Sequence, residues 1–306
     1  MRIIRTLFFV AVLFVLSGVS SADANFEPQK GNELRFDLVK NQIVLNVSIQ
    51  GKGTYRMLLD TGVIPSVIDI ELAKELGLEL ETDKASNAAG RGTGSFQIIP
   101  TIIPDVSIGQ EKFGNIRAVT SDLNRLSGPL GEKLHGILGY SLLKDRIFRI
   151  DYKNRTIEFP VDRKELLRRL KGTVYLEKFT FENSDIMPTV RGLRVNGKKL
   201  VATVDTGSSL NVEIFDHRLA EIGLEHLSDA GTVAGVVGAR GKDSIRDVEV
   251  ERLSIGPNAF STQEVSISAV PNKDQVRMGN IGNGFLKNFV VSVNYKDKEF
   301  ILEPVS

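Results

Sequence analysis

Short apolar runs, separated by polar or glycine-containing turns, follow one another along most of the chain. Two of these runs end in the same tripeptide, in "RMLLDTG" at 56–62 and in "VATVDTG" at 201–207. The β-branched residues of the second run are typical of a strand, and short runs between turns favour strands over long helices. The pattern therefore predicts an all-β fold with short helices, in which two strands each end at an Asp-Thr-Gly turn.

The same order of elements occurs twice. Residues 41–80 and 185–227 each contain a strand, a hairpin turn with glycine, a second strand, Asp-Thr-Gly, an apolar stretch and a helix that ends at a glycine. Gly-rich loops follow at 87–97 and 233–243, and the halves close with the similar segments "GILGYSLLKDRIFRIDY" and "GNIGNGFLKNFVVSVNY". A repeat of this length predicts a duplicated β unit and two pseudo-symmetric lobes.

The repeat divides the chain into an N-terminal lobe at 35–159 and a C-terminal lobe at 175–303. Between them, residues 160–174 contain the charged segment "PVDRKELLRRLKG", in which leucines recur at helical spacing. We interpret this segment as a solvated linker helix with one apolar face. A basic helix that binds a partner is the alternative.

The first 24 residues have the order of a secretory signal peptide. Two arginines precede a short apolar stretch at 7–16, and Ala22-Asp23-Ala24 offers a cleavage site. We predict that residues 1–24 are cleaved, that the protein is exported to the periplasm or secreted, and that it does not stay inserted in a membrane. An uncleaved anchor is the alternative, although the apolar stretch is short for a span of about 20 residues.

The composition removes several classes of function. The chain has 306 residues, a formal net charge of +1 and no cysteine. A nearly neutral protein has no general attraction to nucleic acid or anionic lipid, and without cysteine there are no disulfides, thiolate metal sites or cysteine nucleophiles. The three histidines share no metal-ligand spacing. We therefore expect no metal, no cofactor and no nucleic-acid partner.

The two repeated aspartates are the candidate catalytic residues. A carboxylate at the end of a buried strand is costly, and a matched pair suggests that Asp60 and Asp205 meet across a pseudo-twofold axis. Carboxylates placed close together share one proton, so a water held between them meets a general base and a general acid. Such a pair could activate water against a peptide carbonyl without a metal.

The residues after each aspartate fit the same role. Gly62 and Gly207 would let backbone N–H groups approach the carboxylates without a Cβ in the way. Thr61 and Thr206 offer hydroxyls that could hydrogen-bond across the axis and lock the two turns together.

The fourth position of each turn differs between the halves. Ser208 could donate a hydrogen bond to the Asp205 carboxylate and favour its charged form, whereas Val63 offers Asp60 nothing comparable. We therefore assign Asp205 as the more readily ionised partner and Asp60 as the proton holder.

The Gly-rich loops could be hairpins that close over an extended substrate. The glycines concerned are Gly90, Gly92 and Gly94 in the first loop, and Gly235 and Gly238 in the second. Ordinary mobile loops are the alternative. The first loop lacks the spacing of a nucleotide-binding loop, and no G-x-S-x-G or H-E-x-x-H motif is present, which removes the usual hydrolase rivals.

Together these motifs resemble the aspartic proteases of the retropepsin and pepsin clan. The resemblance is carried by DTG after an apolar strand, a Gly-rich loop, and "GILG" followed by "FRIDY". It is nearest to bacterial exported proteins with two retropepsin-like units in one chain. It implies two acid-protease barrels with a cleft between them, the catalytic pair Asp60 and Asp205, and flaps at 88–95 and 234–241.

The resemblance implies an aspartic endopeptidase that cuts extended polypeptides as a monomer. The alternative is a peptide-binding protein that keeps the cleft but has lost efficient turnover. Two departures from the family pattern support it, because Val63 stands where Ala or Ser is usual and Asn280 where an apolar residue is usual. A dimer that pairs like repeats is a third option, which the single-chain duplication disfavours.

Overall fold

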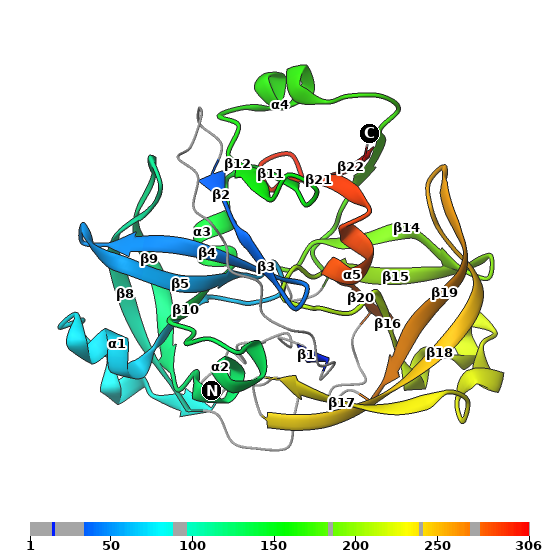
Figure 1. Cartoon of the computed structure of the whole chain (residues 1–306), viewed down its shortest axis with the longest axis horizontal. Coiled ribbons are helices and arrows are strands. Elements are labelled where there is room, and N and C mark those ends of the chain that lie inside the picture. The colour runs from blue at the N-terminus through cyan, green and yellow to red at the C-terminus, as the bar shows by residue number, and fades with distance from the viewer. Residues whose placement is uncertain are drawn as a thin grey trace, which may run out of the picture.

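The computed structural model describes residues 14–15, 34–87, 97–182, 186–238, 241–269 and 276–305. Strands dominate these residues and form three sheets. Figure 1 shows one sheet in each side of the molecule and the third between them at the top. This arrangement confirms the prediction of a mainly β fold with two lobes and short helices.

The N-terminal lobe is built on a sheet in the strand order β3-β4-β5-β10-β6-β9-β8-β7. β4 also pairs with β8, so the sheet closes back on itself. The strands are β3 (Asp37–Val39), β4 (Gln42–Ile49), β5 (Lys52–Leu59), β6 (Ser66–Asp69), β7 (Ser86–Asn87), β8 (Gln97–Ile108), β9 (Glu111–Ser121) and β10 (Gly136–Leu138).

The C-terminal lobe repeats this design in the order β1-β17-β18-β14-β15-β20-β16-β19, with an additional pairing of β18 and β19 that closes the sheet. β14, β15, β20, β16 and β19 take the places of β4, β5, β10, β6 and β9. The strands are β1 (Phe14–Val15), β14 (Thr189–Val195), β15 (Lys198–Val204), β16 (Val212–Phe215), β17 (Thr232–Gly238), β18 (Gly241–Ile255), β19 (Asn258–Ser268) and β20 (Gly279–Ile281).

The third sheet joins the lobes, in the order β13-β22-β21-β11-β12-β2. At its centre β11 and β21 pair antiparallel so that Arg149 faces Ser292, its own counterpart in the repeat. This pairing places an approximate twofold axis between the halves. The strands are β2 (Leu34–Arg35), β11 (Ile147–Asp151), β12 (Thr156–Glu158), β13 (Tyr175–Lys178), β21 (Phe289–Asn294) and β22 (Glu299–Pro304).

The helices are short, and the two halves differ after their DTG turns. In the first half Asp69 caps α1 by accepting hydrogen bonds from the N–H groups of Glu71 and Leu72. In the second half Phe215 offers no such cap, and only 3₁₀ turns form. The α-helices are α1 (Ile70–Glu75), α2 (Asn124–Leu130), α3 (Tyr140–Leu143), α4 (Arg163–Arg169) and α5 (Asn283–Leu286), and the 3₁₀ turns are η1 (Thr82–Lys84), η2 (Asp216–Arg218), η3 (Ala220–Ile222) and η4 (Glu225–Leu227).

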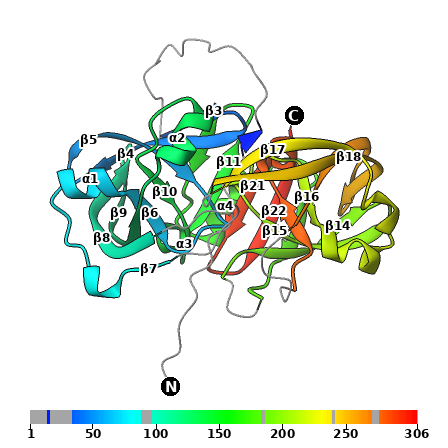
Figure 2. The same cartoon turned by 90° about the horizontal axis from the view of Figure 1, so that it is seen from below.

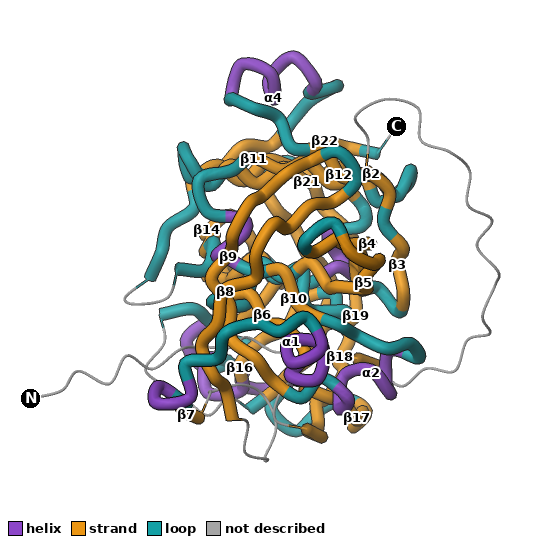
Figure 3. The backbone as a smooth tube through the Cα atoms, turned by 90° about the vertical axis from the view of Figure 1, so that its left-hand side faces the viewer, coloured by secondary structure: helices purple, strands orange, loops and turns teal. Residues whose placement is uncertain are grey.

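The linker segment contains α4, which stands apart from both barrels in Figure 3. Its Leu166 is buried against Ile147 and Ile301, whereas Leu167 is exposed. One apolar face therefore rests on the central sheet, and the role of the segment as a linker stays an interpretation.

Residues 1–24 lie outside the described residues except for β1, so the predicted signal peptide stays a prediction. β1 pairs antiparallel with β17, with Phe14 opposite Val237. Among the described residues, no helix is both long and apolar enough to cross a membrane.

Candidate active site

Each DTG turn follows one strand and is anchored to another. Asp60 follows β5, and its N–H donates to the carbonyl of Leu138 in β10 at 3.0 Å. Asp205 follows β15, and its N–H donates to the carbonyl of Ile281 in β20 at 2.9 Å. These matching bonds give a physical reason why "GILG" and "GNIG" accompany the two DTG motifs.

The threonines join the two turns across the twofold axis. The N–H of Thr61 donates to Thr206 Oγ1 at 3.0 Å, and the N–H of Thr206 donates to Thr61 Oγ1 at 3.1 Å. Thr61 Oγ1 donates in turn to the carbonyl of Val204 at 2.6 Å, and Thr206 Oγ1 to that of Leu59 at 2.9 Å. The hydrogen bonds predicted between the turns are present, and they fix one turn against the other.

Both aspartates are fully buried, and each carboxylate is held by the glycine of its own turn. Asp60 Oδ1 accepts from the N–H of Gly62 at 2.7 Å, and Asp205 Oδ1 accepts from the N–H of Gly207 at 2.9 Å. Burial raises the pKa of the Asp60 carboxyl well above its ordinary value, and the charge of Asp205 raises it further. The pair therefore favours a state in which one proton is held between the two carboxyls.

Gly207 lies directly against the carboxyl group of the other lobe. A Cβ at this position would lie 2.2 Å from Asp60 Cγ, so no side chain fits there. The glycine that the sequence predicts as a support residue is thus what lets the second turn approach the first carboxylate.

The second glycine of each closing segment packs behind the turn of its own lobe. A Cβ at Gly139 would lie 2.3 Å from Val63 Cγ1, and one at Gly282 would lie 2.4 Å from the carbonyl oxygen of Leu210. Val63, a departure from the family pattern, is fully buried and fills this space. Its presence is therefore compatible with the geometry of the turn.

Asn283 is a support residue that sequence reasoning missed. Its Nδ2 donates to the carbonyl of Thr206 at 2.7 Å, and its Oδ1 accepts from the hydroxyl of Tyr152 at 2.7 Å. This chain of bonds ties the second turn to the central sheet. The repeated tyrosines at the ends of the closing segments were the signal in the sequence that could have pointed to it.

In the described part of the chain the first turn has no such tie. Tyr140 occupies the position of Asn283, and Tyr295 occupies that of Tyr152. The hydroxyl of Tyr295 is buried without a hydrogen-bond partner among the described residues. Burial raises the pKa of the Tyr295 phenol, and the neighbouring Tyr140 and Asp60 raise it further.

Gln42 is a second residue that sequence reasoning missed. It begins β4 in the N-terminal lobe, is fully buried, and donates from Nε2 to the carbonyl of Gly207 at 2.8 Å. Neighbouring Asn41 donates to the carbonyl of Ser209 at 3.2 Å. The first lobe therefore supports the catalytic turn of the second. At the position of Gln42 the second lobe has Met187, whose side chain has no N–H or O–H to donate.

Ser208 does not take the place that its sequence position suggested. Its hydroxyl accepts from the N–H of Leu210 at 3.4 Å, and within the described parts of the chain it makes no bond to the Asp205 carboxylate. The serine side chain closes its own turn instead. The prediction that Ser208 favours ionised Asp205 is wrong. Because both aspartates are fully buried, the assignment of the proton to Asp60 stays a prediction.

One of the two expected flaps is described. β17 and β18 form a hairpin in which Gly238 faces Gly241 and Gly235 faces Ser244, with residues 239–240 outside the described residues. Figure 2 shows this hairpin running from the C-terminal lobe toward the middle of the molecule. Gly90, Gly92 and Gly94 of the other expected flap also lie outside the described residues.

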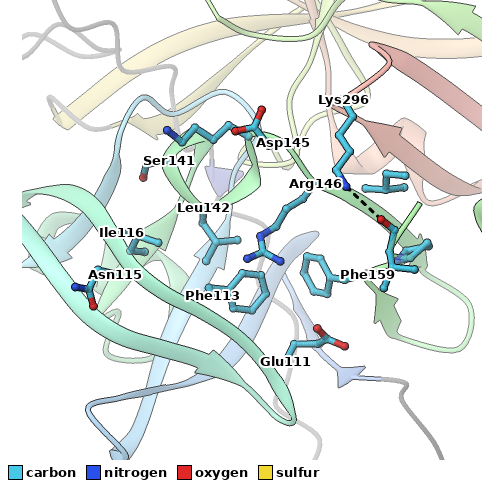
Figure 4. A pocket seen from close by; sticks show the side chains of 14 residues that line it. Glu111, Phe113, Asn115, Ile116, Ser141, Leu142, Asp145, Arg146, Phe159 and Lys296 are labelled. Carbon is cyan, nitrogen blue, oxygen red and sulfur yellow. Dashed lines mark hydrogen bonds between the residues drawn. The ribbon is translucent and has the colours of Figure 1, made fainter. Parts of the chain in front are cut away.

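A surface pocket of about 520 Å³ lies elsewhere, between the β9 hairpin, the start of β11 and the linker. Figure 4 shows the Arg146 guanidinium over the Phe113 ring, with Phe159 beside them and Lys296 at the rim. Neither Asp60 nor Asp205 lines it, so it is not the candidate active site.

Two closed β lobes whose DTG turns bond reciprocally are what the resemblance to retropepsin-like aspartic proteases implies. Residues 45–142 match the family model described as aspartyl protease, so the N-terminal lobe carries an aspartyl protease domain. No curated protein matches the chain.

Proposed function

We propose that the protein is an aspartic endopeptidase that hydrolyses peptide bonds of extended polypeptides. One observation carries this proposal: two buried carboxylates lie on turns that reciprocal threonine hydrogen bonds hold together. A binding protein has no need of this costly pair. An enzyme that activates water does need it.

The proposed mechanism uses the inequality of the two carboxyls. Asp205 acts as general base and takes a proton from a water that attacks the peptide carbonyl. Asp60, whose pKa burial and the second carboxylate raise, acts as general acid and protonates the developing oxyanion. When the tetrahedral intermediate collapses, Asp205 gives the water proton to the leaving amine nitrogen. Asp60 takes a proton back from a hydroxyl of the intermediate, which restores the starting state of the pair.

An edge of the β17–β18 hairpin supports the proposal that the substrate is an extended polypeptide. β17 pairs with Phe14–Val15 as an added antiparallel strand, so the backbone of this edge is able to hold an extended segment. A polypeptide bound there would be held by main-chain hydrogen bonds, as in other cases of strand addition.

The sequence supports two further parts of the proposal. The order of residues 1–24 favours export and cleavage, after which the chain would act in the periplasm or outside the cell. The internal twofold brings both catalytic turns into one chain, which favours a monomer that works without nucleic-acid or membrane partners.

Peptide cleavage tests the proposal. The protein is incubated with a mixed peptide library between about pH 4 and pH 7, beside the variants Asp60→Asn and Asp205→Asn and with a statine-type transition-state analogue. Cleavage that either variant abolishes and the analogue blocks is the expected result. Peptide binding without cleavage, unchanged in both variants, would favour the peptide-binding protein.

A further inference from the structure

A row of five apolar side chains crosses the sheet of the N-terminal lobe. The strand register sets neighbouring members directly opposite one another, from β4 through β5, β10 and β6 to β9. All five belong to one buried cluster. We call this row the apolar wall: Val44, Leu58, Ile137, Val67 and Val119.

The same register in the C-terminal lobe gives five polar side chains. They lie on β14, β15, β20, β16 and β19, and their exposed fractions are between 0% and 4%. Each takes the place of one member of the apolar wall. We call this row the polar wall: Thr189, Thr203, Asn280, Glu213 and Ser266.

The difference is confined to one face of each sheet. On the opposite face, Met57 and Leu59 of the first lobe and Ala202 and Val204 of the second belong to the same apolar core. The duplicated barrel therefore folds around an apolar core in both halves. The polar wall is a feature of one lobe that the fold itself does not require.

Each wall lies beside its catalytic turn. Leu58 and Thr203 each precede the catalytic aspartate by two residues. Val237 of the β17 hairpin packs into the cluster of the apolar wall, and the same residue faces Phe14 of the added strand. Figure 1 shows β17 reaching from its own lobe to α2 of the other. The apolar wall is therefore next to where an extended substrate would run.

The polar wall offers both hydrogen-bond donors and acceptors. Glu213 accepts from Asn280 Nδ2 at 2.6 Å and from the hydroxyl of Ser268 at 2.5 Å. Arg277, at the position of Leu134 in the other lobe, donates to Asn280 Oδ1 at 3.3 Å. The Arg277 guanidinium beside the wall is opposite in charge to the Glu213 carboxylate within it. The wall and Arg277 together therefore have no net charge that would select a charged group.

Thr203 completes this set of side chains. Its hydroxyl is fully buried and has no hydrogen-bond partner among the described residues. A buried hydroxyl without a partner is unfavourable, and a ligand that supplies the partner removes that cost.

Resting on the proposed function, we propose that the polar wall is a specificity subsite for a neutral, hydrogen-bonding side chain such as Gln or Asn. The apolar wall takes an aliphatic or aromatic side chain on the other side of the scissile bond. The protein thereby selects polypeptides with an apolar residue on one flank and an amide residue on the other.

The test compares matched peptides. Each peptide has Leu on one side of the scissile bond and either Gln or Leu on the other. Gln is placed on each side in turn, so the set contains Leu/Gln peptides in both orders and the Leu/Leu peptide. Because a site built to hydrogen-bond a side chain rejects analogues that lack the group, kcat/KM for the best Leu/Gln peptide should exceed that for Leu/Leu by at least about tenfold. Equal or higher kcat/KM for Leu/Leu would overturn the inference.

Variants locate the selectivity. The double variant Glu213→Val and Asn280→Ile gives the second lobe the residues that the first has at 67 and 137. It should lose or reverse the preference for Gln while still cutting Leu/Leu. Ile214→Val, a neighbour that faces the apolar core, is the matched control and should keep the preference. A preference unchanged in the double variant would contradict the role of the wall.

Failure of the inference and failure of the proposed function give different results. If the wild-type protein cleaves none of the peptides, the proposed enzymatic function fails, but the proposed subsite is not yet tested. Affinities of the same peptides, measured by calorimetry with Asp60→Asn, then still test the wall, and equal affinity for Leu/Leu and Leu/Gln overturns it. If the double variant does not fold, the wild-type comparison decides by itself.

Discussion

The two DTG turns share a backbone design but have different supports. The turn of the C-terminal lobe accepts hydrogen bonds from the side-chain amides of Asn283, in its own lobe, and Gln42, in the other lobe. For the turn of the N-terminal lobe the corresponding residues are Tyr140 and Met187, and Val63 fills the space behind the turn by packing. One turn is fixed by directional bonds and the other by apolar contact.

This difference shows which parts of the site the duplication keeps and which it leaves free. The aspartates, threonines and glycines form reciprocal bonds, so a change in one half removes a contact from the other. The supports behind the turns each contact only one of the two turns and can diverge. A pair of carboxyls that must hold one proton between them benefits from unequal surroundings, because one carboxyl has to be the acid and the other the base.

The largest expected effect is the loss of either carboxylate. Asp60→Asn and Asp205→Asn should each lower kcat/KM by about 10²–10⁴-fold, since each removes one of the two proton-transfer groups. Activity is measured on one cleaved peptide, and circular dichroism checks that the variants are folded. If one of the variants keeps full activity, the aspartate that it replaces takes no part in the reaction.

Loss of either threonine hydroxyl should destabilise the protein by the same amount, because the two threonines make reciprocal hydrogen bonds. Thr61→Val and Thr206→Val each remove a donor and an acceptor from a buried network, which should lower the free energy of unfolding by roughly 2–4 kcal/mol. Urea denaturation measures the cost. Thr120→Val is the control, because its hydroxyl makes only a long 3.4 Å bond to the carbonyl of Ile99 and should cost less than about 1 kcal/mol. A clearly different loss of unfolding free energy in Thr61→Val and Thr206→Val would contradict the equal roles of the two threonines.

The Gln42 side-chain amide, which bonds from the N-terminal lobe to the turn of the C-terminal lobe, should matter for activity, whereas its counterpart Met187 should not. Gln42→Met leaves the carbonyl of Gly207 without its donor and should cost about 1–3 kcal/mol of stability, with a lower kcat and little change in KM. Met187→Gln puts the same amide at the matching, fully buried position of the other half, so it should also lower stability, by about 1–3 kcal/mol for an amide without a partner. It removes no donor from a DTG turn and should leave kcat unchanged. A loss of kcat as large as that of Gln42→Met would show that the two positions have the same role.

The buried tyrosines give a smaller contrast. Tyr152→Phe removes the bond to Asn283 and should cost about 1 kcal/mol in the free energy of unfolding. Tyr295→Phe removes a hydroxyl without a partner among the described residues, so its cost should be near zero. Chemical denaturation of both variants decides, and a larger cost for Tyr295→Phe would contradict the difference between the turns.

The pH dependence of stability sharpens the comparison further. A carboxyl whose pKa is raised in the folded state binds its proton more tightly there, so its contribution to stability falls as the pH rises above its ordinary value of 3.8. Asp60→Asn removes this loss. Its melting temperature relative to wild type should therefore increase from about pH 4 toward pH 7, and a constant difference would mean that Asp60 titrates normally.

Much of the fold was readable from local sequence signals. The Asn-Gly turn between β14 and β15 is present, with Asn196 and Gly197 both at positive φ, and Gly77 and Gly223 end their helical segments at positive φ as predicted. The helix expected after the second DTG forms only 3₁₀ turns. The reason is a single position, where Phe215 stands in place of the capping Asp69.

The site was predictable where the sequence repeats and unpredictable where the halves differ. The aspartates, threonines and glycines stand in matched positions, so their meeting could be inferred from the duplication. Gln42 and Asn283 reach the second turn through contacts between distant segments, which no local pattern encodes. The polar wall depends on the lateral register of five strands, and Asn280 alone looked like an unexplained departure until that register placed it beside Glu213.

The central claim is that Asp60 and Asp205 form one site that shares a proton. A double-mutant cycle tests it most directly, with kcat/KM measured at one pH for the wild type, Asp60→Asn, Asp205→Asn and the double variant. Because either substitution alone removes the shared proton site, the double variant should be no slower than the slower single variant. Losses that multiply in the double variant would show two independent groups and would contradict the claim.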